Sequence, residues 1–264
     1  MTYKWFFFCV LCCLPACSGD DDQASIIQLQ QPDAEPMPNG DAGGFADVGI
    51  QTDVALASDA AQSTRIQARF RVIRPDTGGG FSGVRVVGEF GESTTDANGF
   101  ATIELNSGPY VVELNAPGAR IHRVYGVAGD SDFDQVTYLS TEMITGFVFQ
   151  AAGRQDDQAR GILVVGLDLP SLAPAVGSSA SIDATHDAPF IVVGGRPTDG
   201  QEIVQGAQGF VTFPNVEPGT VDVSADFADR GVCGVFPAEM GSGRVEVTAG
   251  EVAIIAFTCR MTEP

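Results

Sequence analysis

The chain has 264 residues, of which 14 are Lys or Arg and 34 are Asp or Glu, so its formal net charge is −20. This charge repels phosphate backbones and argues against nucleic-acid binding. Two histidines leave little material for His-based catalysis or a multi-His metal site, and 32 glycines argue against an all-helical protein. The length suits one or two domains once unstructured ends are discounted.

The first residues have the pattern of a secretory signal. Lys4 precedes an apolar run from Trp5 to Leu14, which is too short to span a membrane. The next residues, Leu14-Pro15-Ala16-Cys17, resemble the lipobox of bacterial lipoproteins. This resemblance implies that residues 1–16 are removed as a signal peptide and that Cys17 is lipidated, which would anchor the protein in the membrane. Plain secretion with cleavage nearby is the alternative.

A linker over residues 17–63 follows the lipobox. Ser18 gives no signal for retention at the inner membrane, so we expect a lipid-anchored protein of the cell envelope at the outer membrane. Ser18 to Gln62 contains nine acidic residues and no Lys or Arg. Low hydrophobicity with uncompensated charge does not repay the entropy of ordering, so the sequence predicts an acidic disordered linker.

From Thr64 onward the apolar residues recur with period two, which is typical of half-buried strands. Turn residues separate short strands in two blocks, 64–152 and 153–264, and no apolar stripe predicts a core helix. We therefore expect an all-β protein with two Ig-like or transthyretin-like antiparallel β-sandwiches. The continuous apolar runs Ile162–Val165 and Phe190–Val193 indicate central strands covered on both faces. The expected strands include Ile66–Val72, Val84–Phe90, Ala101–Leu105, Tyr110–Ala116, Ile162–Leu169, Phe190–Val193, Phe210–Phe213, Val221–Ala225, Val245–Val247 and Val252–Cys259.

The two blocks share a local pattern. Asn98-Gly99-Phe100 with the later turn Ser107-Gly108-Pro109 parallels Gln208-Gly209-Phe210 with Pro218-Gly219-Thr220. Each copy predicts a hairpin with packed inner positions. The first copy, which begins at Thr95-Asp96-Ala97-Asn98-Gly99, resembles the carboxypeptidase regulatory-like domains, which are transthyretin-like sandwiches. The resemblance implies a fold and an accessory role without catalysis.

Two cysteines, Cys233 and Cys259, remain after the signal peptide and the lipidated residue are set aside. In an oxidising envelope compartment this pair predicts a structural disulfide. Thiol catalysis is the alternative, and only Arg230 and Arg260 lie near enough in sequence to lower a thiol pKa.

Three aspartates, Asp130, Asp132 and Asp134, have the spacing with which calcium loops collect oxygen ligands. An EF-type loop has Gly at its sixth position and Glu at its twelfth, where this chain has Gln135 and Thr141. Solvated turn carboxylates are therefore the favoured interpretation, and a calcium site is the weaker one. Arg120 and Arg123 are candidates to pair with these aspartates.

Other polar residues are candidates for catalytic, metal-binding or ion-pair roles. Ser131, Asp183 and His186 superficially match the nucleophile, orienting acid and base of an esterase, although no α/β pattern surrounds them. His122 and His186 have no metal-ligand spacing and are expected to be surface histidines. The cluster Arg65, Arg69, Arg71 and Arg74 is expected to pair with acids on neighbouring strands.

These observations predict an envelope-anchored lipoprotein that acts as a non-catalytic binding or structural module without a cofactor. Its expected partner is an unidentified envelope protein or polysaccharide. An esterase-like envelope hydrolase and a calcium-stiffened adhesin are the alternatives.

Overall fold

The computed structural model describes residues 64–227, 230–240 and 243–262. The predicted signal peptide, Cys17 and the acidic linker lie outside the described residues, so their predictions stay open. In the described ranges, no helix has both the length and the apolar character needed to cross a membrane.

The first half is a pair of sheets around one core. Its strands are β1 (Arg65–Ile73), β2 (Arg85–Gly88), β3 (Gly91–Thr94), β4 (Phe100–Asn106), β5 (Gly108–Asn115), β6 (His122–Ala128) and β7 (Phe133–Tyr138). One sheet has the order β4-β1-β7, and the other contains β6-β5-β2-β3. In β1 the alternation places Ile66, Ala68 and Phe70 inside and Gln67 and Arg69 outside. The buried residues of β1, β4, β2, β5 and β6 form one hydrophobic cluster between the two sheets.

The second half has a second, separate core. Its strands are β8 (Gly161–Asp168), β9 (Ser179–Ile182), β10 (Phe190–Val193), β11 (Arg196–Asp199), β12 (Ala207–Val216), β13 (Gly219–Asp226), β14 (Gly231–Val235), β15 (Gly243–Val247) and β16 (Val252–Met261). The sheet β15-β13-β9 lies over the order β11-β10-β12-β8-β16, and β14 pairs with β16. Large side chains such as Phe213 and Phe257 are fully buried between them.

The predicted sandwiches are present, and their strand pairing is repeated. In the first half β1 pairs antiparallel with β4 and parallel with β7, and in the second half β8 pairs antiparallel with β12 and parallel with β16. The facing sheets β6-β5-β2 and β15-β13-β9 are antiparallel in both halves. The sequence pattern had indicated antiparallel sheets, and the structure adds these parallel pairs.

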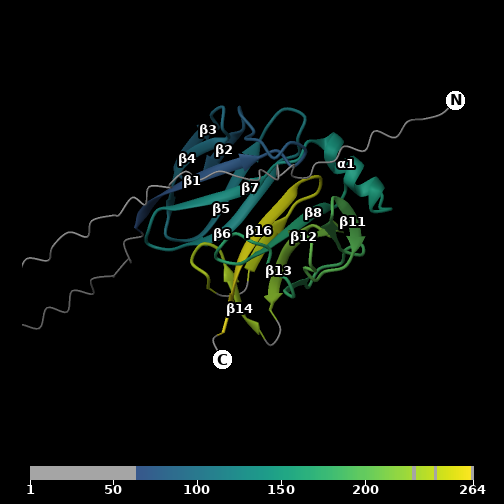
Figure 1. The fold of residues 1–264 in the computed structure, drawn as a ribbon. Coiled ribbons are helices and arrows are strands. Elements are labelled where there is room, and N and C mark those ends of the chain that lie inside the picture. The colour runs from purple at the N-terminus through teal and green to yellow at the C-terminus, as the bar shows by residue number, and fades with distance from the viewer. Residues whose placement is uncertain (1–63, 228–229, 241–242, 263–264) are drawn as a thin grey trace, which may run out of the picture. The chain divides into compact units, whose positions relative to one another are not determined.

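One strand joins the halves into a continuous sheet. β16, drawn in yellow, lies between β6 of the first half and β8 of the second, and it runs parallel to both (Figure 1). Ile254 of β16 packs against the first core. Strand β16 therefore keeps the two halves in one sheet. The domain boundary expected between residues 152 and 153 stays a prediction.

The predicted hairpins are wrong. β4 and β5 are consecutive, yet β4 belongs to the sheet β4-β1-β7 and β5 to the sheet that faces it. β12 and β13 cross between sheets in the same way. At the two crossings Gly108 has φ 108° and Gly219 has φ 144°, values that residues with a side chain rarely adopt. Alternating burial cannot distinguish such an arch from a hairpin, because both strands place every second residue in the core in either case.

The all-β prediction is confirmed, and the structure adds one short helix, α1 (Glu142–Ala151), after β7, which the sequence pattern had not indicated. The Thr141 side chain caps it by accepting a hydrogen bond from the Ile144 N–H. Phe149 is buried and meets Phe190 of β10 edge-to-face at 6.3 Å between ring centroids, and it shares a hydrophobic cluster with Ile162 of β8. The helix thus covers the outer face of the two strands that the continuous apolar runs had predicted to be buried on both faces.

Candidate functional site

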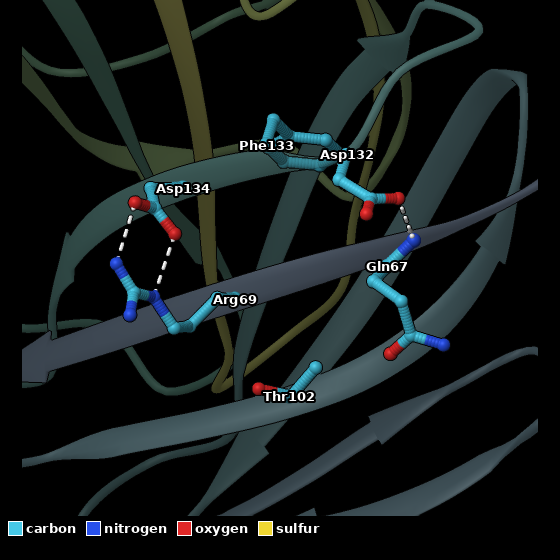
Figure 2. A pocket seen from close by; sticks show the side chains of 6 residues that line it. All are labelled: Gln67, Arg69, Thr102, Asp132, Phe133 and Asp134. Atoms are coloured by element: carbon cyan, nitrogen blue, oxygen red, sulfur yellow. Dashed lines mark hydrogen bonds and ion pairs between the residues drawn. The ribbon is translucent and has the colours of Figure 1, made fainter. Parts of the chain in front are cut away.

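A hollow on the outer face of β1 is the first place where polar side chains gather. It is lined by Gln67 and Arg69 of β1, Thr102 of β4, and Asp132, Phe133 and Asp134 at the start of β7. Outward positions of β1 alternate with core positions, so Gln67 and Arg69 point to the same side. Figure 2 shows Arg69 facing Asp134 at one side of the hollow, Gln67 facing Asp132 at the other, and Thr102 between them.

The polar groups of this hollow are largely bonded to one another. Arg69 donates from Nε and Nη2 to the two carboxylate oxygens of Asp134, both at 2.7 Å. This two-pronged hydrogen bond lowers the pKa of Asp134 below its ordinary value. The Gln67 backbone N–H donates to Asp132 at 2.7 Å, and its side-chain amide donates to Glu104 at 3.1 Å. The polar groups of the hollow are therefore largely satisfied by one another or by neighbouring residues, and none of its lining residues is a nucleophile next to a base.

The structure does not bring the three candidate calcium ligands together. Asp134 faces Arg69, Asp132 accepts the Gln67 N–H, and Asp130 lies in the exposed turn before them. Across residues 64–227, 230–240 and 243–262, no group of three or more His, Cys, Asp or Glu side chains is placed to hold a metal ion.

The pairing expected for the arginine cluster is confirmed for Arg65 and Arg69, which meet acids on neighbouring strands, whereas Arg74 pairs with an acid two residues away in the turn after β1. Arg65 lies 3.5 Å from Glu104, and Arg74 pairs with Asp76 at 2.8 Å. Arg71 instead stands over the Phe100 ring, with its guanidinium carbon 5.5 Å from the centroid.

The pairing expected for two later arginines is wrong. Arg120 pairs with Asp156, and Arg123 pairs with Glu251 at 3.0 Å, so neither reaches the aspartates of the 130–134 turn. Asp156 and Glu251 belong to the second half of the sequence, and only the folded arrangement brings them to these arginines.

The esterase candidates are not assembled. Asp183 accepts a hydrogen bond from the Asp222 N–H at 2.9 Å, while His186 Nδ1 lies 2.6 Å from the Asp187 carbonyl oxygen. Ser131 is exposed in the turn before β7. A triad requires the base to contact both the acid and the nucleophile, and the described contacts of Asp183 and His186 lead to backbone groups instead.

A second hollow surrounds Asp183. It is lined by Ser181, Ile182, Asp183, Asp222, Val223 and Ser224. The Ser181 and Ser224 hydroxyls are hydrogen-bonded at 2.8 Å, and Asp222 accepts from Arg244 at 2.8 Å. This hollow too consists of mutually satisfied cross-strand pairs.

The prediction of His122 as a surface histidine is wrong. Only 2% of its surface is exposed. Its Nδ1 lies 2.9 Å from the Arg120 carbonyl oxygen, and its Nε2 lies 3.4 Å from the Ser140 N–H nitrogen. Burial lowers the pKa of His122 to about 4, so the ring is neutral near pH 7. His186 is half-buried, with its ring edge-to-face against Phe213.

The predicted disulfide is present. Cys233 of β14 and Cys259 of β16 are direct cross-strand partners and are bonded through their sulfurs. The bond ties the strand β14 to the strand that joins the two halves.

One cluster was not found from the sequence. Tyr138, the last residue of β7, and Phe210 of β12 have ring centroids 6.4 Å apart. Asp168, the last residue of β8, is close enough to Tyr138 to raise its pKa further, although burial is the main cause of that shift. The only signal in the sequence is a carboxylate directly after the apolar run of β8.

Comparisons with known proteins name no family for this chain. No family model and no curated protein matches the chain. Among solved structures, the minor pilin GBS52 of Streptococcus agalactiae is 12% identical with a TM-score of 0.28, over 76% of this chain and 98% of that chain. The major pilin of Streptococcus pyogenes is 10% identical with a TM-score of 0.23, over 75% and 98%. The Bacillus anthracis TIE protein is 12% identical with a TM-score of 0.24; the match covers 75% of this chain and only 34% of that protein.

Proposed function

We propose that this chain is a lipoprotein of the cell envelope whose β-sandwiches serve as a non-catalytic binding or structural module. The observation that carries the non-catalytic part is that both hollows consist of side chains bonded to one another. Arg69 is held by Asp134, and Ser181 by Ser224. Such pairs fix strand register and present a preformed surface, but they leave no activated nucleophile.

The anchoring part is supported by the Leu14-Pro15-Ala16-Cys17 sequence and the acidic residues that follow it. Acyl chains on Cys17 would add about 0.8 kcal/mol of membrane affinity for each buried CH₂ group, so two or three chains hold a protein stably. The negative charge of the chain would keep the folded part away from an anionic bilayer.

The anchor is tested by mass spectrometry of the mature N-terminal peptide and by fractionation of cells. We expect acyl chains on Cys17 and release of the Cys17→Ala variant from the membrane fraction. Cys12→Ala is the matched control and should remain membrane-bound. An unmodified Cys17 at the mature N-terminus would refute the anchor.

The binding role is tested by chemical crosslinking on intact cells, which should yield a reproducible partner from the envelope. Hydrolysis of short-chain p-nitrophenyl esters by the wild type and by Ser131→Ala tests the competing hydrolase. We expect both proteins to match the uncatalysed background. Ester hydrolysis that disappears in Ser131→Ala would replace the binding role with an enzymatic one.

A further inference from the structure

Three side chains from distant parts of the sequence form a surface cluster, which we name the Tyr138–Asp168–Phe210 cluster. The Tyr138 and Phe210 ring planes are inclined at 49° with centroids 6.4 Å apart, so the rings touch without stacking face to face. Tyr138 is 49% exposed, and Phe210 and Asp168 are half-buried. Two aromatic rings and a carboxylate are therefore accessible at one place.

The position of Asp168 depends on a glycine. The Asp168 carboxylate lies directly against Gly209, and a methyl group at this glycine would overlap Oδ1 of Asp168. Phe210 pairs with Gly166 of β8, and Asp168 lies two residues after Gly166, so the alternation of side chains places Asp168 and Phe210 on the same face of the sheet. The pairing of β8 with β12 thus sets Asp168 on the same face as Phe210, and the electrostatic effect of Asp168 on Tyr138 indicates that this second side chain is near the acid as well.

Asp168 has no cation of its own. In the part of the chain that the structure describes, its carboxylate makes no hydrogen bond or ion pair, and burial raises its pKa to about 7. A half-buried charge without a partner costs free energy, which an approaching cation would recover. The arginines of the chain do not supply this cation, since most of them pair with other acids, as Arg69 does with Asp134 and Arg244 with Asp222.

We propose that the Tyr138–Asp168–Phe210 cluster binds a basic side chain of a partner protein, with Asp168 as the ion-pair partner and the two aromatic rings as cation–π partners. The proposal deepens the proposed binding function and rests on it. Arginine and lysine cations bind the faces of aromatic rings, and desolvation strengthens both this contact and the ion pair. The net charge of −20 attracts positively charged partners from a distance, so charge complementarity selects a basic polypeptide.

The test is calorimetric titration of the detergent-purified protein at pH 8, where the carboxylate is mostly ionised. The probes are the peptide Gly-Gly-Arg-Gly-Gly with blocked ends and the same peptide with Gln in place of Arg. We expect saturable binding of the Arg peptide and at least tenfold weaker binding of the Gln peptide. Asp168→Asn and Tyr138→Ala should each weaken binding of the Arg peptide about tenfold.

Glu217→Gln is the matched control, because it also removes one exposed acid from the chain but not from the cluster. It should leave the affinity unchanged, which separates a local site from general attraction to an acidic protein. Equal weakening by Glu217→Gln and Asp168→Asn would overturn the proposal. Asp168→Asn retains the size of the side chain, and its circular dichroism and unfolding midpoint confirm that a loss of binding is not a loss of fold.

Two further probes distinguish the source of the cation. Tetramethylammonium and N-acetylglucosamine test a small organic cation and a neutral sugar. If either binds in an Asp168-dependent manner while the Arg peptide does not, the assignment to a polypeptide is overturned. If the crosslinked envelope partner persists in Asp168→Asn, the cluster is not the binding surface, although the proposed binding function stands.

Discussion

Two titratable groups with opposite pKa shifts, the buried His122 and the half-buried Asp168, should make the stability of this protein depend on pH in opposing directions. Burial raises the pKa of Asp168 from its ordinary value of 3.8 to about 7, and burial lowers the pKa of His122 from 6.5 to about 4. Asp168 acts on Tyr138 electrostatically, while the hydrogen bond of His122 to the Arg120 carbonyl raises the His122 pKa and the Arg120 charge lowers it, both less strongly than burial lowers it. Between pH 4 and 7, the folded protein therefore holds a proton on Asp168 that the unfolded chain releases, and it lacks the proton that the unfolded chain places on His122.

The size of each effect on the free energy of unfolding follows from the pKa shift of the group. A tenfold change in proton affinity is worth about 1.4 kcal/mol, so Asp168 lowers the free energy of unfolding by up to about 4 kcal/mol as the pH rises from 4 to 7. By the same conversion, His122 raises it by up to about 3 kcal/mol between pH 4 and 6.5. We therefore expect the two effects to cancel in large part in the wild type, which should show little change in stability from these groups over this range.

Asp168→Asn should reveal the pH dependence of stability that His122 alone produces. The assay is urea unfolding of the detergent-purified protein at intervals from pH 4 to 8, followed by circular dichroism. The variant should gain stability with rising pH, by up to about 3 kcal/mol, because only His122 then contributes. It should also be more stable than the wild type at pH 8. Glu217→Gln should retain the wild-type profile. If Asp168→Asn shifts stability equally at pH 4.5 and pH 8, the raised pKa and the buried position of Asp168 are refuted.

Three further substitutions test the packing. Replacing both Cys233 and Cys259 by serine should lower the free energy of unfolding by about 3 kcal/mol, since the bond closes a loop with a sequence separation of 26; an unchanged urea midpoint would contradict this. Phe149→Ala should cost about 3 kcal/mol by the same assay because the ring is buried, whereas Phe147→Ala, at a 68% exposed position, should cost under about 0.5 kcal/mol. Gly108→Ala should cost about 1 to 3 kcal/mol because φ is 108°, and an unchanged thermal midpoint would mean that the crossing has another geometry.

Strands that alternate strongly were predictable because their burial pattern is local. The range expected for Ile66–Val72 became β1, and Phe190–Val193 matches β10 in full. The single strand expected over Val84–Phe90 is instead β2 and β3, because the chain turns between Gly88 and Gly91. β9, β11 and β14 were missed, since short strands with few buried residues carry almost no periodic signal. β6 and β7 are also absent from the expected ranges, because several of their buried positions, among them His122, Gln135 and Thr137, are polar and do not register as an apolar alternation.

The sheet to which each strand belongs was not predictable, because it depends on the path of the chain between strands and not on the local burial pattern. Whether β4 and β5 pair or face each other depends on the path of the backbone at Gly108, and the alternation of Leu105 and Tyr110 is the same in both cases. The helix α1 escaped detection because only Thr145 and Phe149 are buried, while Met143 and Phe147 point outward. Two buried residues at i and i+4 are too few to define an apolar stripe.

Among the candidate site residues, the disulfide was predictable by elimination, because Cys233 and Cys259 were the cysteines that remained. The burial of the His122 and Asp168 side chains was not predictable, since the residues that surround each of them are remote in sequence. His122 is enclosed by Ser140 and β16, and Asp168 by Gly209 and Tyr138. A titratable side chain at the end of an apolar strand can be solvated or buried, and the strand alone does not decide between them.

The joined sheet carries two residues of the Tyr138–Asp168–Phe210 cluster, and the third, Tyr138, ends β7 of the sheet β4-β1-β7, which packs against the joined sheet around the first core. Tyr138 comes from the first half and the other two residues from the second. The halves are held in one sheet by the parallel pairing of Val252–Ile255 in β16 with His122–Tyr125 in β6, while β16 also pairs with β8, which ends at Asp168. Because hydrogen-bonded strands fix these positions before a ligand arrives, binding at the cluster orders little new structure and loses little affinity to entropy. A substitution that weakens the β6–β16 pairing should therefore weaken binding of the Arg peptide without changing any residue that touches it.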